Sequence, residues 1–189
     1  MPGCRWASKL SAMEPPEMIY AGELVLKRWK PQWADEAAAA IRESLPELKP
    51  FMPFAQDDYD AVAARAFIEA SVDKWAKGTQ FNYAIFTTVG DLVGAIGLMT
   101  RLGPGVLEIG YWMRTSFSRR GYMSAAVSAL TRVALTLPGI DRVAIRHDAA
   151  NAASAAVAAK AGFMEVERIN REPKAPGETD TAIIWERRT

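Results

Sequence analysis

Apolar side chains recur along this chain with two different periods, and each period predicts one kind of element. A helical period predicts helices over 35–44, 58–77, 122–137 and 152–161. Short apolar runs between turn residues predict strands over 24–29, 81–88, 92–100, 106–113, 142–147, 163–169 and 179–187. Residues 1–20 show no clear period, so we expect a loose N-terminal arm over 1–20 and a single domain over 21–189.

The order of these elements predicts the fold class. Three strands between residues 81 and 113 follow one another through short turns, which is typical of an antiparallel meander. The later strands alternate with helices, which is typical of crossover connections. We therefore expect an α+β domain with a central, mostly antiparallel twisted sheet of about 6–7 strands and helices on both faces.

Composition and charge exclude several classes of protein. The 189 residues are 50% hydrophobic and carry a formal net charge of +1, which argues against a general nucleic-acid binder. The single cysteine, Cys4, cannot form an internal disulfide, and with the single histidine, His147, it cannot complete a zinc site of N and S ligands. No apolar run reaches the roughly 18 residues of a membrane span. Glu14 and Glu17 lie where a signal peptide needs an apolar stretch, so we expect a cytoplasmic protein.

A short basic turn joins the strand 106–113 to the helix 122–137. It contains Ser118-Arg119-Arg120-Gly121-Tyr122-Met123-Ser124. The first amides of a helix lack internal acceptors and favour anions, and two arginines suit a phosphate group. A solvated turn is the alternative interpretation, since the glycine patterns of dinucleotide folds and P-loops are absent.

A second polar segment follows one crossover later, from His147 to Ser154, and leads into Lys160-Ala161-Gly162-Phe163. Asn151 is well suited to cap a helix, which is the structural interpretation of this segment. Because one crossover joins the strands 106–113 and 142–147, we expect their ends to be neighbours. A ligand would then place its phosphates on the first helix and its chain past the second.

Taken together, these segments resemble the GNAT N-acetyltransferase superfamily, and within it the ribosomal-protein N-terminal acetyltransferases (RimJ/RimL-like). Arg119-Arg120-Gly121-Tyr122 is similar to the acyl-CoA motif Q/R-x-x-G-x-G/A, and Asn151-x-x-Ser154 with Lys160-x-Gly162-Phe163 is similar to a motif of that branch. The segments 108–112 and 48–54 resemble its fourth strand and its acceptor-side loop, and the resemblance runs from about Leu24 to Arg187. The chain departs from the family pattern at Ser118, Met123, Ala158 and Ala159; many members carry a tyrosine general acid at the position of Ala158.

The resemblance implies acetyl transfer from acetyl-CoA to a primary amine. The cofactor-binding residues that it implies are Tyr111, Trp112, Met113, Arg119, Arg120, Gly121, Tyr122, Met123, Ser124, Asn151, Ser154 and Lys160. It also places Ser154 near the cofactor sulfur, which makes Ser154 the candidate general acid. Phe51, Met52 and Phe54 would contact the acceptor.

No cysteine–histidine or serine–histidine–acid spacing is recognisable, so direct attack in a ternary complex is favoured over an acyl-enzyme. Glu108 is our candidate base, acting through water, with an arginine-paired structural carboxylate as the alternative; His147 and water alone stay open. Strand alternation puts Glu108, Gly110 and Trp112 on one face and Ile109, Tyr111 and Met113 on the other. A backbone amide of the Tyr111/Trp112 strand would polarise the thioester carbonyl.

An α-amine with a pKa near ~8 costs about 1–1.5 kcal/mol to deprotonate at pH 7, whereas a lysine costs about 4–5 kcal/mol. This difference favours the N-terminal α-amine of a protein or peptide as acceptor. A small amine such as a polyamine or antibiotic stays open, since Asp57, Asp58 and Asp60 are near the acceptor loop. A non-catalytic acyl-CoA-binding sensor also stays open because of Ala158 and Ala159. The sequence does not decide between a monomer and a homodimer.

Overall fold

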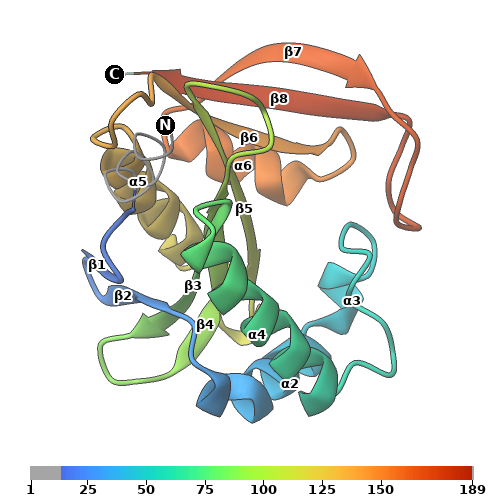
Figure 1. Ribbon diagram of the computed structural model, residues 1–189. Helices are drawn as coiled ribbons and strands as arrows, with labels where there is room; N and C mark the ends of the chain where they lie inside the picture. Colours follow the sequence, from blue (N-terminus) through green and yellow to red (C-terminus); the bar gives the residue numbers. More distant parts are fainter. Residues whose placement is uncertain (1–13, 189) are drawn as a thin grey trace, which may run out of the picture.

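The computed structural model describes residues 14–188, which form an eight-stranded sheet covered by helices (Figure 1). The strands, whose order in the sheet is β1-β2-β3-β4-β5-β6-β8-β7, are β1 Met18–Ala21, β2 Leu24–Arg28, β3 Gln80–Thr87, β4 Leu92–Met99, β5 Val106–Met113, β6 Arg142–Asp148, β7 Met164–Asn170 and β8 Thr181–Arg188. The helices are α2 Ala34–Glu43, α3 Leu45–Leu48, α4 Ala61–Ala76, α5 Tyr122–Ala134 and α6 Ala152–Lys160, with 3₁₀ turns η1 Pro31–Trp33 and η2 Thr115–Phe117. No helix within residues 14–188 has the length and apolar character needed to cross a bilayer.

The sheet is antiparallel except at its centre, where β5 and β6 are parallel. These two strands pair only from Val106↔Arg142 to Ile109↔Ile145. Because β5 continues to Met113 and β6 to Asp148, the strands diverge beyond Ile109. The predicted mostly antiparallel sheet is therefore confirmed, and its divided centre leaves one edge of β5 open.

Helices cover both faces of the sheet, as predicted, and a hydrophobic core lies on each face. One core packs α5 and α6 against Leu107 and Ile109 of β5, with Tyr111 and Met113 at its margin. The other packs α2 and α4 against residues that include Trp112. The alternation expected for β5 is confirmed, and Glu108, Gly110 and Trp112 share the face of α2 and α4.

Two expectations need correction. The sheet has eight strands rather than six or seven, because residues 18–21 form β1 and pair antiparallel with β2. The segment before it is also held, since Glu14 accepts a 2.6 Å hydrogen bond from Trp75 Nε1 and Pro16 O accepts one from Tyr83. A loose arm therefore does not extend to residue 20, and the part of it over 1–13 lies outside the described residues. Four residues are too short for a periodic signal, which is why β1 was not predicted.

The acceptor-side loop expected over 48–54 follows the short helix α3, which was not predicted. Pro46 occupies the first turn of α3, a position that tolerates proline, so it both ends α2 and starts the next helix. Helix α4 begins later than predicted because Asp60 caps it by accepting a hydrogen bond from Ala63 N. Helix α5 ends at Ala134, three residues before the expected Leu137.

Candidate active site

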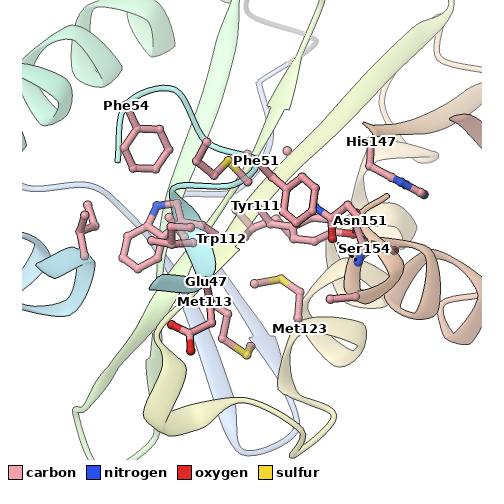
Figure 2. A pocket seen from close by; sticks show the side chains of 18 of the residues that line it. Glu47, Phe51, Phe54, Tyr111, Trp112, Met113, Met123, His147, Asn151 and Ser154 are labelled. Atoms are coloured by element: carbon pink, nitrogen blue, oxygen red, sulfur yellow. Dashed lines mark hydrogen bonds between the residues drawn. The ribbon is translucent and has the colours of Figure 1, made fainter. Parts of the chain in front are cut away.

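A groove of about 2050 Å³ runs from the loop after α3, across the divided centre of the sheet, to the start of α5 and the side of α6. Figure 2 shows side chains from these separate segments facing one space. All predicted site residues line the groove except Arg120: Phe51, Met52, Phe54, Glu108, Tyr111, Trp112, Met113, Arg119, Gly121, Tyr122, Met123, Ser124, Asn151, Ser154 and Lys160. The structure thus brings together residues that lie up to about a hundred positions apart in the chain.

The start of α5 has the features of an anion site. Gly121, the residue before the helix, has φ +79°, and no side chain caps the first turn. The first helical bond is from Ala125 N to Gly121 O, so the amides before Ala125 have no acceptor within the helix. Lys160 Nζ lies 3.4 Å from the point that a Cβ on Gly121 would occupy. A positive side chain and free amides therefore meet at one turn.

The other residues of the basic turn have different surroundings. Arg120 donates to Ser116 O at 3.0 Å and lies over the Phe117 ring, and it does not line the groove. Arg119 lines the groove and has φ +62°, which is uncommon for a residue with a side chain. Met123 is buried in the core, so its bulk does not block the free amides of the turn.

The open edge of β5 presents backbone groups to the groove. Arg114 N donates to Val93 O of the neighbouring β4 segment at 2.8 Å. Because successive amides alternate sides along a strand, the amides of Tyr111 and Met113 point to the opposite side, where β6 has diverged. Of the Tyr111/Trp112 pair considered in the sequence, it is thus Tyr111 whose amide faces the gap.

A pair of hydroxyl groups spans this gap. Tyr111 Oη lies 2.7 Å from Ser154 Oγ, and burial raises the pKa of Tyr111 to about 12, so the phenol stays protonated. Asn151 Oδ1 accepts a 3.0 Å hydrogen bond from Ser154 N, so its side chain caps α6 as the structural interpretation expects. The protonated phenol of Tyr111 therefore holds the hydroxyl of Ser154 in place at the edge of the groove.

Glu108, the candidate base, is enclosed by arginines. Its side chain is 2% exposed, and its two oxygens accept hydrogen bonds of 2.6 and 2.7 Å from Arg101. Arg146 Nε lies 3.5 Å from one of them. A general base needs an oxygen directed at the proton or at a bridging water, and here both oxygens already bind guanidinium groups. The base role of Glu108 stays a prediction, and its contacts favour the arginine-paired alternative.

His147 has both ring nitrogens engaged. Trp185 Nε1 can only donate, and it lies 2.9 Å from His147 Nε2, so Nε2 is the acceptor. The proton is then on Nδ1, which donates to Asp148 O at 2.7 Å. Burial lowers the pKa of His147 below its ordinary value, which keeps the ring neutral. These contacts give His147 a structural role and leave no free nitrogen for an incoming amine.

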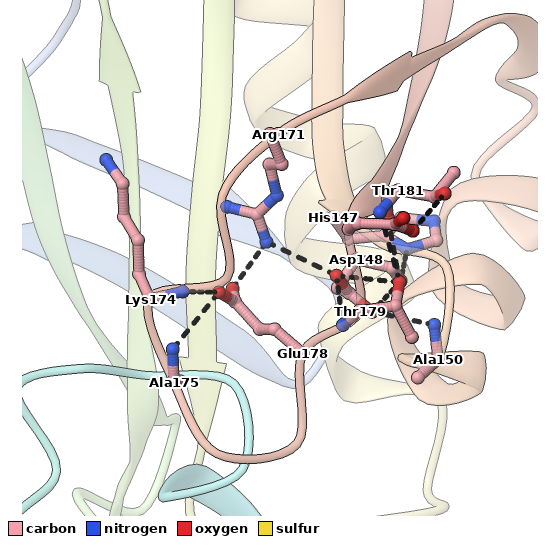
Figure 3. A network of polar contacts seen from close by, with 10 residues as sticks. His147, Asp148, Ala150, Arg171, Lys174, Ala175, Glu178, Thr179 and Thr181 are labelled. Atoms are coloured by element: carbon pink, nitrogen blue, oxygen red, sulfur yellow. Dashed lines mark hydrogen bonds and ion pairs between the residues drawn. The ribbon is translucent and has the colours of Figure 1, made fainter.

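Sequence reasoning missed one wall of the groove, the β7–β8 loop over 171–180. Figure 3 shows its centre, where Arg171 lies between Asp148 and Glu178. Asp148 is 1% exposed and also accepts hydrogen bonds from the amides of Ala150 and Thr179, both at 2.9 Å. Burial raises the pKa of Asp148, but these hydrogen bonds and the Arg171 charge outweigh it and hold the pKa below its usual range.

The same loop touches the acceptor-side loop. Gly177 N donates to Pro50 O at 2.8 Å, and a Cβ on Gly177 would lie 2.5 Å from Pro50 Cβ. Glycine is therefore required for this close approach. The only signal in the sequence was the Pro176-Gly177 pair, which indicates a turn without naming its partner. Within residues 14–188, no group of three or more metal-ligating side chains comes together.

The fold and the groove define a class of protein, the acetyltransferases, as comparison with known families confirms. The model of the acetyltransferase (GNAT) domain matches residues 23–164, and the chain belongs to this family. Among solved structures, it is similar to the microcin C7 self-immunity acetyltransferase MccE in complex with acetyl-CoA and AMP (18% identity, 94% of this chain, 99% of that chain, TM-score 0.84). It is also similar to RimL, the ribosomal L7/L12 α-N-protein acetyltransferase, in complex with coenzyme A (20%, 91%, 98%, 0.83). A third similar structure is Mycobacterium smegmatis RimJ with CoA-disulfide (18%, 92%, 86%, 0.80). No curated protein matches the sequence.

Proposed function

We propose that this protein transfers the acetyl group of acetyl-CoA to the N-terminal α-amine of a protein or peptide, by direct attack in a ternary complex. The observation that carries the proposal is the continuous groove, which joins an anion-binding turn on one side of the sheet to an apolar mouth on the other. Such a groove admits a phosphate-bearing donor from one side and an amine from the other. The two ligands would meet at the open edge of β5.

The start of α5 fits the pyrophosphate of coenzyme A. Its free amides, the left-handed turn at Gly121 and the neighbouring Lys160 ammonium offer donors and positive charge at one point. Arg119 lines the groove beside this turn and would add a second positive charge. Arg120 would contribute only if it left Ser116 O, so we assign it a smaller role.

The chain's part in the chemistry is positioning and polarisation. Acetyl-CoA supplies the activated acetyl group as a thioester. The amides of Tyr111 and Met113 would donate to the oxygen that gains charge as the amine attacks. Ser154 would donate a proton toward the departing sulfur, with the hydroxyl of Tyr111 fixing its orientation at 2.7 Å. Holding both reactants in one groove supplies a large part of the remaining acceleration.

The contacts of Glu108 and His147 also bear on the acceptor. An α-amine needs only about 1–1.5 kcal/mol to lose its proton at pH 7, so water suffices as the proton acceptor. A lysine would need a stronger base than the groove offers. This difference supports an α-amine as the acceptor. Proton removal by Glu108 through a bridging water is the alternative to be tested.

The mouth of the groove suits a polypeptide. Phe54, Val62 and Phe67 line it and are 40%, 74% and 43% exposed. Exposed apolar side chains gathered around one opening are typical of a surface that binds another chain. The small-amine alternative retains one observation, since Asp58 and Asp60 line the same groove. Asp60, however, already caps α4.

The test is release of free coenzyme A from acetyl-CoA, with N-terminal peptides, lysine peptides with blocked N-termini, polyamines and aminoglycosides as acceptors. We expect turnover with the N-terminal peptides. Mass spectrometry should locate the acetyl group on their α-amine. Turnover with polyamines or aminoglycosides alone would favour the small-amine alternative. Binding of coenzyme A without turnover on any acceptor would favour the sensor. Failure to bind coenzyme A would overturn the proposal.

A further inference from the structure

A cluster of positive side chains lies at the inner end of the acceptor side of the groove. Glu108 is at its centre, with Arg101 bound to both of its oxygens and Arg146 3.5 Å from one of them. The carboxylate is 2% exposed, whereas Arg101 and Arg146 are 52% and 31% exposed. The negative charge is therefore buried behind the two positive charges, both of which line the groove.

The neighbouring wall has the reverse ratio of charges, one arginine between two carboxylates. Arg171 is 24% exposed and pairs with both Asp148 and Glu178, which are 1% and 6% exposed (Figure 3). Lys174, on the same loop, is exposed and lines the groove. Three buried carboxylates thus balance three arginines whose outer sides line this end of the groove, and Lys174 leaves these seven groups with a net charge of +1.

The guanidinium groups retain unused donors. An arginine has five N–H groups; Arg101 uses its Nε and one Nη nitrogen on Glu108, and Arg146 makes one contact at the long distance of 3.5 Å. Arg171 Nε is buried without a hydrogen-bond partner among the described residues. A carboxylate from a ligand supplies the flat pair of acceptors that such groups bind best.

The arginine cluster also lies on the face of β5 that carries Gly110, at a defined distance from the place of the attacking amine. Glu108 and Gly110 point to the same face of β5, two residues apart, which is about 6.6 Å along a strand. The attacking amine belongs near the open edge of β5 beyond Ile109. The α-carboxylate of a free amino acid lies only about 3–4 Å from its own amine and falls short of the cluster. The side chain of the second residue of a peptide reaches it, since each residue spans about 3.3–3.6 Å.

We propose that Arg101 and Arg146, held by Glu108, bind an acidic side chain close to the N-terminus of the acceptor, so that the preferred substrate is an acidic N-terminal peptide. This inference rests on the proposed function and names the substrate class of the same groove. It assigns Glu108 a positioning role, in which it orients the two arginines. Polycationic amines are disfavoured at this end by charge repulsion.

The experiment compares peptides of equal length that begin with serine and carry Asp, Asn or Lys at position 2. We expect kcat/KM to be about 10-fold or more higher for the Asp peptide than for the Lys peptide, as a charge-assisted contact predicts. The preference should weaken as salt is raised. Free aspartate serves as a further acceptor, and we expect it to react poorly.

Arg146→Gln is the principal variant, because Arg101 still pairs with Glu108 when Arg146 is removed. Thermal unfolding checks that the variant keeps its fold. We expect it to lose most of the Asp-over-Lys preference, because the KM for the Asp peptide rises more than the KM for the Asn or Lys peptide. Glu108→Gln should likewise weaken the acidic preference; an equal fall in kcat for all three peptides would instead mark Glu108 as the base. Arg132→Gln, on the exposed side of α5 and outside the groove, is the matched control.

The outcomes separate this inference from the proposed function. Acetylation of all three peptides at equal rates, or an equal loss on all three in Arg146→Gln, overturns the acidic-peptide assignment and leaves the N-acetyltransferase intact. Free aspartate reacting as well as the peptides overturns the assignment of the carboxylate to a peptide side chain. Coenzyme A binding with no peptide acetylated overturns both.

Discussion

Replacing Asp148 with asparagine tests how the β7–β8 loop is held over the acceptor side of the groove. The carboxylate is 1% exposed, and its two oxygens accept hydrogen bonds from Ala150 N, Thr179 N and the Thr179 hydroxyl. The asparagine side chain of the variant keeps one accepting oxygen. Its NH₂ group then faces the backbone N–H of Ala150 or Thr179, which loses its acceptor. A charge-assisted hydrogen bond contributes about 1.5–3 kcal/mol, and a buried donor left unpaired costs about 1–3 kcal/mol.

We therefore expect Asp148→Asn to lower the free energy of unfolding by about 3 kcal/mol, which is about 6–12 °C in Tm for a chain of this size. Thermal and urea unfolding measure it, with Asp141→Asn as control because that side chain is 69% exposed and its ion pair with Arg142 is long, at 3.4 Å. The control should change stability by less than about 0.5 kcal/mol. The KM for the acceptor should rise, because Asp148 holds Thr179 and Arg171, while the KM for acetyl-CoA is unchanged.

The pH dependence follows from the direction of the pKa shift. Because the pKa of Asp148 is lower in the folded protein than in the unfolded chain, its contribution is fully present above the unfolded pKa of about 3.9 and is lost as the pH falls through the folded pKa. The difference between wild type and Asp148→Asn should be constant from pH 8 to pH 5 and shrink below about pH 4. A stability loss under about 1 kcal/mol at pH 7, or a difference that stays unchanged at the lowest pH where both proteins are folded, would refute the reasoning.

Three further predictions concern the groove and the sheet beside it. Ser154→Ala should lower kcat about 10- to 100-fold and leave the KM for acetyl-CoA within about threefold. Tyr111→Phe should lower kcat by a smaller factor. Unchanged rates of both variants in the thiol-release assay would exclude the hydroxyl pair from catalysis. Gly121→Ala should weaken coenzyme A binding several-fold by calorimetry, since φ +79° costs a residue with a Cβ about 1–2 kcal/mol, and undiminished affinity would contradict the phosphate site. Because the pKa of His147 is lowered in the folded protein, its contribution to stability is present above about pH 6.5 and falls as the unfolded chain takes up a proton below that pH. Part of the fall in Tm between pH 7 and pH 5.5 should therefore be absent in His147→Gln. If Tm falls with pH equally steeply in the variant and in the wild type, this interpretation is contradicted.

Local sequence patterns predicted much of the fold. The strand over 106–113 has the observed bounds of β5, because eight residues between two turn signals are long enough to show alternation. The cap at Asn151 was also predicted, since it depends only on its immediate neighbours in the chain. Strand β1 was missed because its hydrogen bonds to β2, rather than any periodicity of its own, define it.

What the sequence determined by itself was the order of elements and the segments that carry chemistry, because helix periods, strand alternation and turn residues act over a few positions. Only the tertiary structure decided which partners those segments meet. The sequence left open whether Glu108 is a base or an arginine-paired carboxylate, and Arg101 and Arg146 enclose it only because β4, β5 and β6 lie side by side. Gly177 and Pro50 are more than a hundred residues apart, and their contact exists only because two loops meet over the groove. Contacts of this kind depend on the packing of the whole sheet, and no local pattern encodes them.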